Sequence, residues 1–342
     1  MIQRHHRLAL YMERAFEEKT GKLGLGVLRY SENDIVCLVD SLSVGKDLRG
    51  LTGIDHSAPV VASIQEAKRL GADVLVLGIA PPGGLVPDDW WPALDEAVSL
   101  GMSLVNGLHD KLGTRYPILA PSQFVWDVRT EPSGLGVGTA AARLMDNRRV
   151  LMIGTDMSVG KMTAGLELAR SANNRGIRCS FVATGQTGMV ITGSGIPLDA
   201  IRLDYASGAV EREVCKYSES EIVIIEGQGS LVHPGSSANL PLIRGSCPTH
   251  FVLCHRAGME SLPRIPWIDV PDLLALAKLY EDLSEACGVF PRAKLAALSL
   301  NTGHLSETDA LSAIRAIHEE TGIPACDPVR QGAEVLLESV LG

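Results

Sequence analysis

The feature that most constrains this chain is a glycine loop between an apolar run and a helical pattern. The apolar residues 150–153 lead directly into residues 154–161, which read GTDMSVGK, and apolar residues at helical spacing follow. A strand, a glycine loop and a helix in this order turn several backbone N–H groups toward one point at the positive end of the helix, where the lysine adds a full charge. We therefore expect a bound phosphate here. The alternative is a tight turn with an exposed lysine.

The loop departs from the usual P-loop at two positions. Five residues separate Gly154 from Gly160 instead of four, and Met162 directly follows Lys161, with the hydroxyl one place later at Thr163. The usual Ser or Thr after the lysine binds Mg²⁺, and a thioether is a poor ligand for so hard a cation. Phosphate binding is thus better predicted than Mg·ATP binding. The spacing GTDxxVGK is similar to the loop of dethiobiotin synthetase, an ATP-using P-loop family that has Thr directly after the lysine.

Length, charge and cysteine usage limit the class of protein. The 342 residues suggest two domains, and 46% hydrophobic residues with 35 glycines suit an α/β protein. The net charge of −9, with no Lys/Arg run beyond a pair, argues against a nucleic-acid partner. No apolar run approaches the roughly 20 residues of a membrane helix, so we expect a cytoplasmic chain with no membrane partner. The seven cysteines form no CxxC motif and are interpreted as reduced core thiols.

Apolar strands alternate with helical patterns along the whole chain. In the first half we expect strands at residues 35–40, 60–61, 73–80 and 102–106, and helices at residues 1–19, 64–70 and 90–100. In the second half, beyond the strand and helix that flank the glycine loop, we expect strands at residues 179–184, 222–226, 250–254 and 295–300, and helices at residues 209–216, 271–287, 307–320 and 333–341. Such alternation predicts parallel sheets covered on both faces.

The fold class that follows is α/β, with two parallel-sheet domains. Residues 130–147 carry Pro, Ser and several Gly before turning helical, which is typical of a domain boundary. We predict an N-terminal Rossmann-like domain at residues 1–140 and a P-loop NTPase-like domain at residues 141–342. Residues 41–46 (SLSVGK) repeat four letters of the main loop but lack its leading glycine and precede only a short helix, so we do not interpret them as a second phosphate loop.

Polar residues gather where the predicted strands of the second half end. Glu226 ends an apolar strand and precedes Gly227-Gln228-Gly229, a position where P-loop proteins keep a carboxylate that positions metal or water. The alternative is a helix cap or a buried acceptor. His233 has a pKa range suited to a general base, or it is structural. Asn301 ends the last long strand and either reads a ligand or caps the following helix.

Two further clusters follow strands in the same way. Gln186 lies in the sequence ATGQTG, and Arg256 ends the sequence Cys-His-Arg. In a parallel sheet all carboxyl ends lie on one edge, so these clusters are expected to meet around the P-loop. The loop IAPPGG, at residues 79–84, also follows a strand; it lies at an edge where ligands bind in open α/β sheets, and we interpret it as a rigid turn.

Several motifs together resemble one known family. GTDMSVGKMT, ATGQTG, IEGQGSLVHPG and LNTGHL occur in this order, behind a first half that carries GIAPPGG and MSLVNGLH. They resemble the DgcN-like family, long known as a domain of unknown function, and the resemblance spans nearly the whole chain. One branch of that family is described as D-glutamate N-acetyltransferase. The resemblance thus implies acetyl transfer from acetyl-CoA to the amino group of an amino acid, D-glutamate or a relative.

This resemblance, joined to the residues, gives a set of expected roles. A P-loop can hold the phosphates of coenzyme A without a metal, which makes Met162 compatible with function. The expected base or oxyanion residues are Glu226, His233 and Gln186, and the expected substrate-carboxylate residues are Arg256 and Arg244. The expected cofactor-binding residues are Gly154, Thr155, Asp156, Ser158, Val159, Gly160, Lys161, Met162, Thr163, Gln228 and Asn301.

Two other classes of function stay open. An ATP-dependent ligase or kinase would use Mg²⁺, with Thr163, Asp156 and Glu226 as candidate ligands. A nucleotide-sensing module would need fewer polar strand ends than this chain has. We also expect a small-molecule amino-acid substrate and a homo-oligomer.

Overall fold

The chain folds into two compact units, each built around one parallel sheet. A computed structural model describes residues 1–18, 20–81, 83–117 and 119–342. The first unit comprises residues 1–131 and 185–200, and the second comprises residues 132–184 and 201–342. The strand orders are β3-β2-β1-β4-β5-β6 and β14-β13-β10-β7-β9-β8, and every pairing within these two sheets is parallel. The predicted fold class of two parallel-sheet α/β domains is confirmed.

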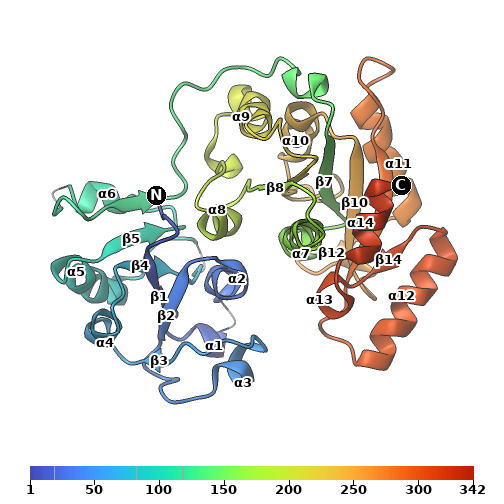
Figure 1. Ribbon diagram of the computed structural model, residues 1–342. Coiled ribbons are helices and arrows are strands. Elements are labelled where there is room, and N and C mark those ends of the chain that lie inside the picture. The colour runs from blue at the N-terminus through green and yellow to red at the C-terminus, as the bar shows by residue number, and fades with distance from the viewer. Residues whose placement is uncertain (19, 82, 118) are drawn as a thin grey trace. The chain divides into compact units, whose positions relative to one another are not determined.

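The first unit has the strand order of a Rossmann-like sheet. Figure 1 shows α4 and α5 on one side of this sheet and α2 on the other. The strands are β1 (Arg7–Tyr11), β2 (Asp34–Val39), β3 (Val60–Val61), β4 (Val74–Leu77), β5 (Ser103–Asn106) and β6 (Val125–Asp127). The helices are α1 (Ala15–Glu18), α2 (Lys22–Tyr30), α3 (Leu48–Thr52), α4 (Ile64–Arg69), η1 (Asp88–Trp90), α5 (Trp91–Ser99), α6 (Leu112–Arg115), α8 (Gln186–Thr192) and η3 (Leu198–Ala200).

The predicted opening helix is wrong. Residues 7–11 form β1, which lies between β2 and β4 in the sheet, and only the short α1 follows. Leu8, Ala9, Leu10 and Tyr11 are all buried, because both faces of this strand are covered. A buried strand in a parallel sheet has apolar residues at every position. Charged residues before β1 and apolar residues after it gave the sequence a pattern that is also typical of an amphipathic helix. Lys19, at the end of that prediction, lies outside the described residues, as does Pro82 of the IAPPGG loop.

The second unit contains the P-loop between its strand β7 and its helix α7. The strands are β7 (Arg148–Gly154), β8 (Cys179–Val182), β9 (Ile222–Ile225), β10 (His250–Arg256), β11 (Ser261–Leu262), β12 (Ile265–Asp269), β13 (Lys294–Asn301) and β14 (Ala325–Cys326). The helices are η2 (Ala141–Leu144), α7 (Lys161–Asn174), α9 (Leu203–Cys215), α10 (Asn239–Ser246), α11 (Leu273–Glu285), α12 (Glu307–Thr321), α13 (Pro328–Gln331) and α14 (Glu334–Leu341).

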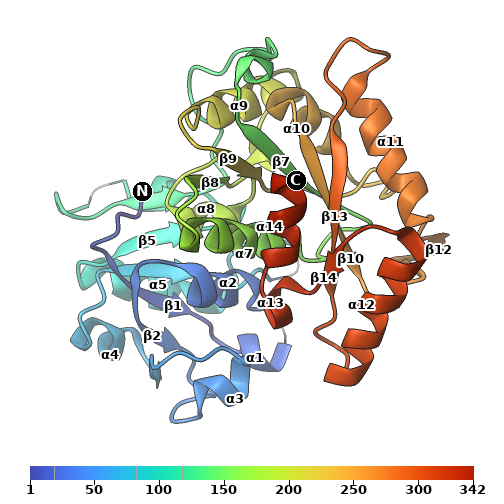
Figure 2. The ribbon, with the colours of Figure 1, turned by 45° about the vertical axis from the view of Figure 1, so that its right-hand side comes forward.

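A continuous core covers one face of the second sheet. Val150 and Met152 of β7 pack with Leu168 of α7 and Leu336 of α14, and all four are fully buried. Figure 2 shows α7 and α14 side by side in front of this sheet, while α9 and α10 lie on its other side in Figure 1. Each such side chain contributes about 1.5–3 kcal/mol when fully buried. The core holds β7 and α7 in place, and it thereby positions the loop between them.

Most of the strands and helices expected from the sequence are present within a few residues of their predicted ends. The sequence analysis missed the strands β1, β6 and β14, the β11–β12 hairpin, and the helices α2, α6, α8, α10 and α13. After residues 41–46 only the five-residue α3 forms, and the Asp47 side chain already accepts the Gly50 N–H at 2.8 Å.

All seven cysteines are free, as expected, but Cys287 is exposed and therefore not a core thiol. None of the helices in the described part of the chain is both long and apolar enough to cross a bilayer.

Candidate functional site

The P-loop connects the carboxyl end of β7 to the amino end of α7. Gly160 is the N-cap residue of α7, with φ +114°, and no side chain caps the first turn. Ser158, within the loop, also has a positive φ of 59°. The uncapped N–H groups of α7 carry the positive end of the helix dipole, which favours an anion. Met162 and Thr163 lie in that first turn, both half-buried. This main-chain geometry suits an anion, and phosphate binding here stays a prediction.

Lys161 folds back over the loop that precedes it. Its Nζ donates to the Asp156 carbonyl oxygen at 2.7 Å, and only 6% of the residue is exposed. A Cβ added at Gly154 would lie 3.0 Å from this Nζ and 2.9 Å from Cγ2 of Val159. Glycine at this position therefore leaves room for the lysine side chain. Val159 itself packs into the core below the loop, so its side chain is turned away from any ligand. The ammonium group is thereby fixed at the loop.

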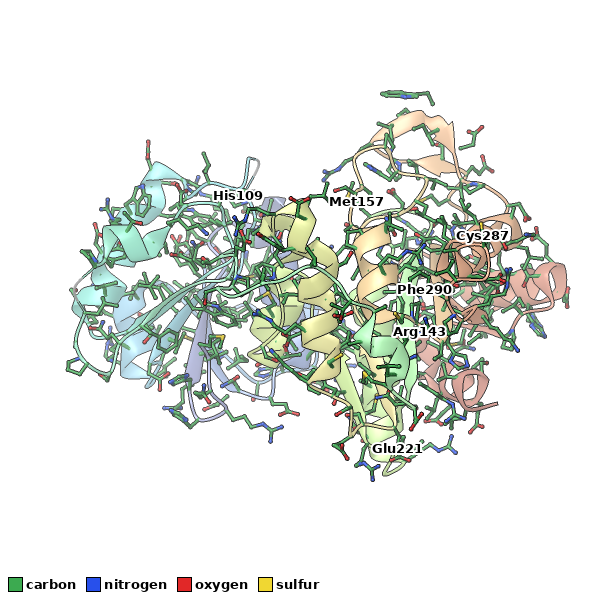
Figure 3. The ribbon with its side chains drawn as sticks, turned by 90° about the horizontal axis from the view of Figure 1, so that it is seen from above. His109, Arg143, Met157, Glu221, Cys287 and Phe290 are labelled. Atoms are coloured by element: carbon green, nitrogen blue, oxygen red, sulfur yellow. The ribbon has the colours of Figure 1, made fainter. Side chains whose placement is uncertain are left out.

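Asp156 holds the loop from within. Its Oδ1 accepts the N–H of Met157 at 2.6 Å, and the residue is 7% exposed. Met157, labelled in Figure 3, is exposed at the loop's tip. A carboxylate bound to the next backbone N–H stabilises a tight turn. The structure thus shows a local hydrogen bond for Asp156, whereas its predicted contact with a ligand stays a prediction.

Glu226 lies directly after β9 and is held by Thr184, the second residue after β8. The Glu226 Oε2 accepts the Thr184 N–H at 2.9 Å, and the Thr184 hydroxyl donates to the Glu226 carbonyl oxygen at 2.8 Å. Both residues are buried, at 5% and 1% exposure. The carboxylate therefore has a fixed orientation at the carboxyl edge of the sheet. Sequence reasoning placed Glu226 correctly at a strand end. It noted Thr184 only as part of the ATGQTG cluster and did not predict its contact with Glu226.

The turn after Glu226 lies against the P-loop. A Cβ added at Gly227 would approach the Met152 carbonyl oxygen to 1.6 Å and Cδ of Lys161 to 3.0 Å, so this position admits only glycine. Gln228 donates from Nε2 to the Thr184 hydroxyl at 3.2 Å. This close approach brings the backbone of the GQG turn beside the P-loop lysine.

Ser230 connects this turn to the P-loop by a hydrogen bond. Its hydroxyl donates to the Thr155 carbonyl oxygen at 3.1 Å, and its N–H donates to Oγ of Ser236 at 3.1 Å. Behind it, the buried Tyr280 donates to Oδ1 of Asn239 at 2.8 Å and accepts the Leu231 N–H at 3.1 Å. Satisfied buried networks of this kind hold a site rigid. Sequence reasoning did not find them, because Tyr280 lies on a distant helix.

His255 is a second residue near the P-loop that sequence reasoning did not select. Its Nδ1 lies 3.1 Å from Oγ1 of the fully buried Thr155. Burial lowers the pKa of His255 to about 4, because the charged imidazolium loses its hydration. The ring is therefore neutral at pH 7 and supports the P-loop as a hydrogen-bonding partner of Thr155.

Asn301 and Arg256 end two paired strands beside the P-loop. The two residues are register partners in the β10–β13 pairing. A Cβ on Gly160 would lie 3.9 Å from Nδ2 of Asn301, so this amide faces the loop. The Asn301 Oδ1 accepts the Gly303 N–H at 3.2 Å, and Ser306, not Asn301, caps α12. Arg256 is exposed at the same edge.

His233 lies in the turn that follows the GQG segment and is half-buried. Its Nδ1 accepts the Gly235 N–H at 3.1 Å. The neutral ring then carries its proton on Nε2 and has no lone pair left to accept a substrate proton. In this arrangement the His233 ring is engaged by the turn, and the roles of Glu226 and His233 as a base both stay predictions.

Two predicted site residues are not brought to the P-loop within the second unit. Arg244 donates to the Leu283 and Ser284 carbonyl oxygens at 2.8 and 3.3 Å, and its guanidinium lies 4.8 Å from the ring centre of Phe290, labelled in Figure 3. These contacts occupy Arg244 at the C-terminal end of α11. Gln186 begins α8 and belongs to the first unit, where a Cβ on Gly107 would lie 3.4 Å from its Cγ.

The sequence predicted three candidate magnesium ligands in the second unit. Within residues 1–18, 20–81, 83–117 and 119–342, no three His, Cys, Asp or Glu side chains are grouped so that they could hold a metal. The thioether of Met162 stands where a P-loop ATPase has its metal-binding hydroxyl. Neither observation tests Thr163, Asp156 and Glu226 directly, and their role as magnesium ligands stays a prediction.

The fold and the site together define a two-domain protein with a Rossmann-like unit and a P-loop unit. Family models agree: residues 41–131 match the Rossmann-like domain of unknown function DUF1611_N, and residues 136–337 match the P-loop domain of unknown function DUF1611_C. The chain belongs to the DUF1611 family.

Three relatives show how far the similarity extends. A crystal structure of a DUF1611 family protein from Anabaena variabilis is 47% identical, covers 98% of this chain and 99% of its own, and has a TM-score of 0.94. A D-glutamate N-acetyltransferase from Tritonibacter scottomollicae is 32% identical over 97% of each chain. Another protein of that name, from a Pseudoalteromonas species, is 33% identical over 81% of this chain and 84% of its own.

Proposed function

We propose that this chain is an N-acetyltransferase that moves the acetyl group of acetyl-CoA to the amino group of D-glutamate or a closely related amino acid. The support is the full-length similarity to proteins named for this activity, together with a P-loop that has Met162 in place of the metal-binding hydroxyl. The phosphates of coenzyme A need hydrogen-bond donors and positive charge. The uncapped first turn of α7 and the ammonium of Lys161 supply both.

In this proposal Glu226 is the general base. The amino group of an amino acid is protonated at pH 7, so a base must take a proton before the nitrogen can attack the thioester carbonyl. A carboxylate held by the Thr184 N–H has a fixed orientation for that transfer. The new C–N bond forms as the carbonyl becomes a tetrahedral oxyanion. The oxyanion then collapses, the C–S bond breaks, and coenzyme A leaves as a thiolate. The thiolate takes up the second proton that the nitrogen loses as it becomes an amide.

The GQG turn after Glu226 is the proposed oxyanion site. Gly227 is packed between β7 and the Lys161 side chain, and Gly229 is packed against Ser236, which supports a preorganised set of N–H groups at residues 227–229. Preorganised donors at a developing oxyanion are typically worth about 10²–10³ in rate each. The Gln228 amide is directed to the Thr184 hydroxyl, which makes it a support of the turn.

The test is an assay of the purified full-length chain with acetyl-CoA and D-glutamate in the presence of EDTA. We expect release of free coenzyme A thiol and formation of N-acetyl-D-glutamate at equal rates. The same protein with ATP, Mg²⁺ and D-glutamate should release no ADP or AMP. ATP turnover that requires Mg²⁺, without acetyl transfer, would support the ligase or kinase class instead.

A further inference from the structure

We propose that Ser230 makes the acyl-transfer step depend on the phosphates of the donor, by connecting the P-loop to the GQG turn at residues 227–229. This inference rests on the proposed function, because it takes acetyl-CoA as the donor and the GQG turn as the oxyanion site. Ser230 acts through its neighbours and is therefore a positioning residue. The contacts that carry the inference all lie within the second unit.

The GQG turn meets the P-loop at both of its ends. At its start, a Cβ added at Gly227 would lie 3.0 Å from Cδ of Lys161. Directly after its end, the Ser230 hydroxyl donates to the Thr155 carbonyl oxygen at 3.1 Å. Ser230 and Thr155 are both fully buried, where a hydrogen bond is stronger than in water. The N–H groups of residues 227–229 therefore lie between two contacts with the P-loop.

Thr155 is held on its other side by the neighbouring strand. Its N–H donates to the Cys254 carbonyl oxygen at 3.1 Å, and its hydroxyl lies 3.1 Å from Nδ1 of His255. Both partners belong to β10, which pairs with β7. The carbonyl oxygen is the group that Thr155 turns toward Ser230. A shift of the peptide bond between residues 155 and 156 is therefore passed to Ser230.

Lys161 connects the phosphate site to this same peptide bond. Its Nζ donates to the carbonyl oxygen of Asp156, the residue that follows Thr155, at 2.7 Å. A phosphate at the start of α7 competes with this carbonyl oxygen for the ammonium, because a charged acceptor forms the stronger hydrogen bond. Occupation of the P-loop thus changes the hydrogen bonding of the residue next to Thr155.

Ser230 is packed firmly against the turn that it positions. Its N–H donates to Oγ of Ser236 at 3.1 Å, and its hydroxyl oxygen accepts the Val232 N–H at 3.3 Å. Gly229 has φ +66°, and a Cβ there would lie 1.8 Å from the same Ser236 oxygen. Gly229 and Ser230 therefore move as one piece, so a displacement of Ser230 reaches the N–H groups of the turn.

The consequence concerns the part of the donor that does not react. Binding energy from a remote part of a substrate can be used to position the reacting centre, and a truncated substrate then loses kcat as well as affinity. The phosphate-bearing end of acetyl-CoA has this role here. S-acetylpantetheine carries the same thioester without the phosphates, and it should react more slowly even at saturation.

The first experiment is hydrogen–deuterium exchange of the full-length protein with free coenzyme A or with pantetheine, which has no phosphate. In the wild type, coenzyme A should slow exchange at residues 154–161 and at residues 227–232. The second effect should be about 3- to 10-fold, the range of one hydrogen bond. Pantetheine should slow exchange at neither segment. In Ser230→Ala, coenzyme A should still protect residues 154–161 but no longer residues 227–232.

Ser246→Ala is the matched control. The Ser246 hydroxyl, like that of Ser230, is fully buried and donates to a carbonyl oxygen, but its acceptor is Leu242 of the same helix α10, at 2.7 Å. This variant should exchange as the wild type does in both segments. Thermal unfolding of each variant checks the fold.

The second experiment compares acetyl-CoA with S-acetylpantetheine in steady-state acetyl transfer to D-glutamate. Ser230→Ala should lower kcat with acetyl-CoA by about 3- to 10-fold and leave the KM for acetyl-CoA nearly unchanged, because the phosphate contacts themselves are intact. With S-acetylpantetheine, Ser230→Ala and the wild type should have the same kcat. A hydroxyl with only a structural role would lower kcat equally with both donors, and that result would overturn the proposal.

The wild type alone also tests the proposal, even if Ser230→Ala does not fold. Coenzyme A that protects residues 154–161 without protecting residues 227–232, or that protects neither segment, would overturn it. The proposed function fails separately. Protection of both segments without acetyl transfer from either donor refutes the function and leaves the connection standing. Acetyl transfer with equal kcat for the two donors refutes the connection and leaves the function standing.

Discussion

Thr184 and Glu226 hold each other through two hydrogen bonds between neighbouring strand ends. The Thr184 N–H donates to the Glu226 carboxylate at 2.9 Å, while the Thr184 hydroxyl donates to the Glu226 carbonyl oxygen at 2.8 Å. One bond fixes the side chain and the other fixes the backbone from which the GQG turn starts. A buried carboxylate fixed in this way is suited to a proton-transfer task in the proposed reaction.

Replacing Glu226 with Gln should separate chemistry from structure. The amide oxygen of Gln can still accept the Thr184 N–H, but the amide cannot take a proton. We expect the rate of acetyl transfer to fall by about 10²–10⁴, with acetyl-CoA affinity and melting temperature nearly unchanged. Turnover, ligand titration and thermal unfolding on one sample would check this. A stable variant with wild-type turnover would refute Glu226 as the base, and His233→Gln provides the matched comparison.

A hydroxyl introduced at the position after the P-loop lysine should leave turnover nearly unchanged. Met162 stands where the metal-binding Ser or Thr of a P-loop ATPase is found, and acetyl transfer as proposed requires no metal. We expect Met162→Ser to change turnover by less than about threefold, and chelation of divalent cations to change it as little. Steady-state rates with EDTA and with added Mg²⁺ would test this. Activity that disappears with EDTA and returns with Mg²⁺ would contradict the account.

His255 should make the folded state sensitive to acid. Burial lowers the pKa of His255 to about 4, whereas the unfolded chain has the ordinary value near 6.5. Between these values the unfolded state binds the additional proton, so the stability contributed by neutral His255 is present above pH 6.5 and is lost as the pH falls toward 4. One group contributes a slope of at most about 1.4 kcal/mol per pH unit.

Urea unfolding at several pH values from 7 to 5 would measure this slope. His255→Gln should lose less stability than the wild type over that interval, because the variant has no buried imidazole to protonate. His5→Gln, at an exposed histidine, is the control and should follow the wild type. Identical slopes for wild type and His255→Gln would refute the assignment.

The sequence predicted those parts of the fold that depend on local patterns. The P-loop at residues 154–161 was found because its glycines, its lysine and its flanking apolar runs lie next to each other in the chain. Glu226 was found because an apolar strand ends there. The strand β1 was missed because burial of both faces depends on β2 and β4, which come later in the chain.

The contacts that define the sites depend on distant residues, and the sequence alone could not predict them. Tyr280 supports the turn after Glu226 from a helix about fifty residues further along the chain. Arg244 carries the positive charge that a substrate carboxylate would need, but its guanidinium donates to a carbonyl oxygen near the end of α11 instead. Gln186 follows a strand of the second unit, yet it packs beside Gly107 in the first. Strand-end chemistry is local, whereas the partner of each side chain is set by tertiary packing.

The central claim is that the P-loop holds the phosphates of acetyl-CoA through Lys161, and calorimetric titration with acetyl-CoA in EDTA tests it most directly. Lys161→Ala should weaken binding by about 1.5–3 kcal/mol, the scale of a charge-assisted hydrogen bond, and should leave the melting temperature nearly unchanged. The matched control is Lys46→Ala, which removes the lysine of the similar letters SVGK at residues 43–46 and should bind as the wild type does. Unchanged affinity in Lys161→Ala, or a loss confined to Lys46→Ala, would contradict the account.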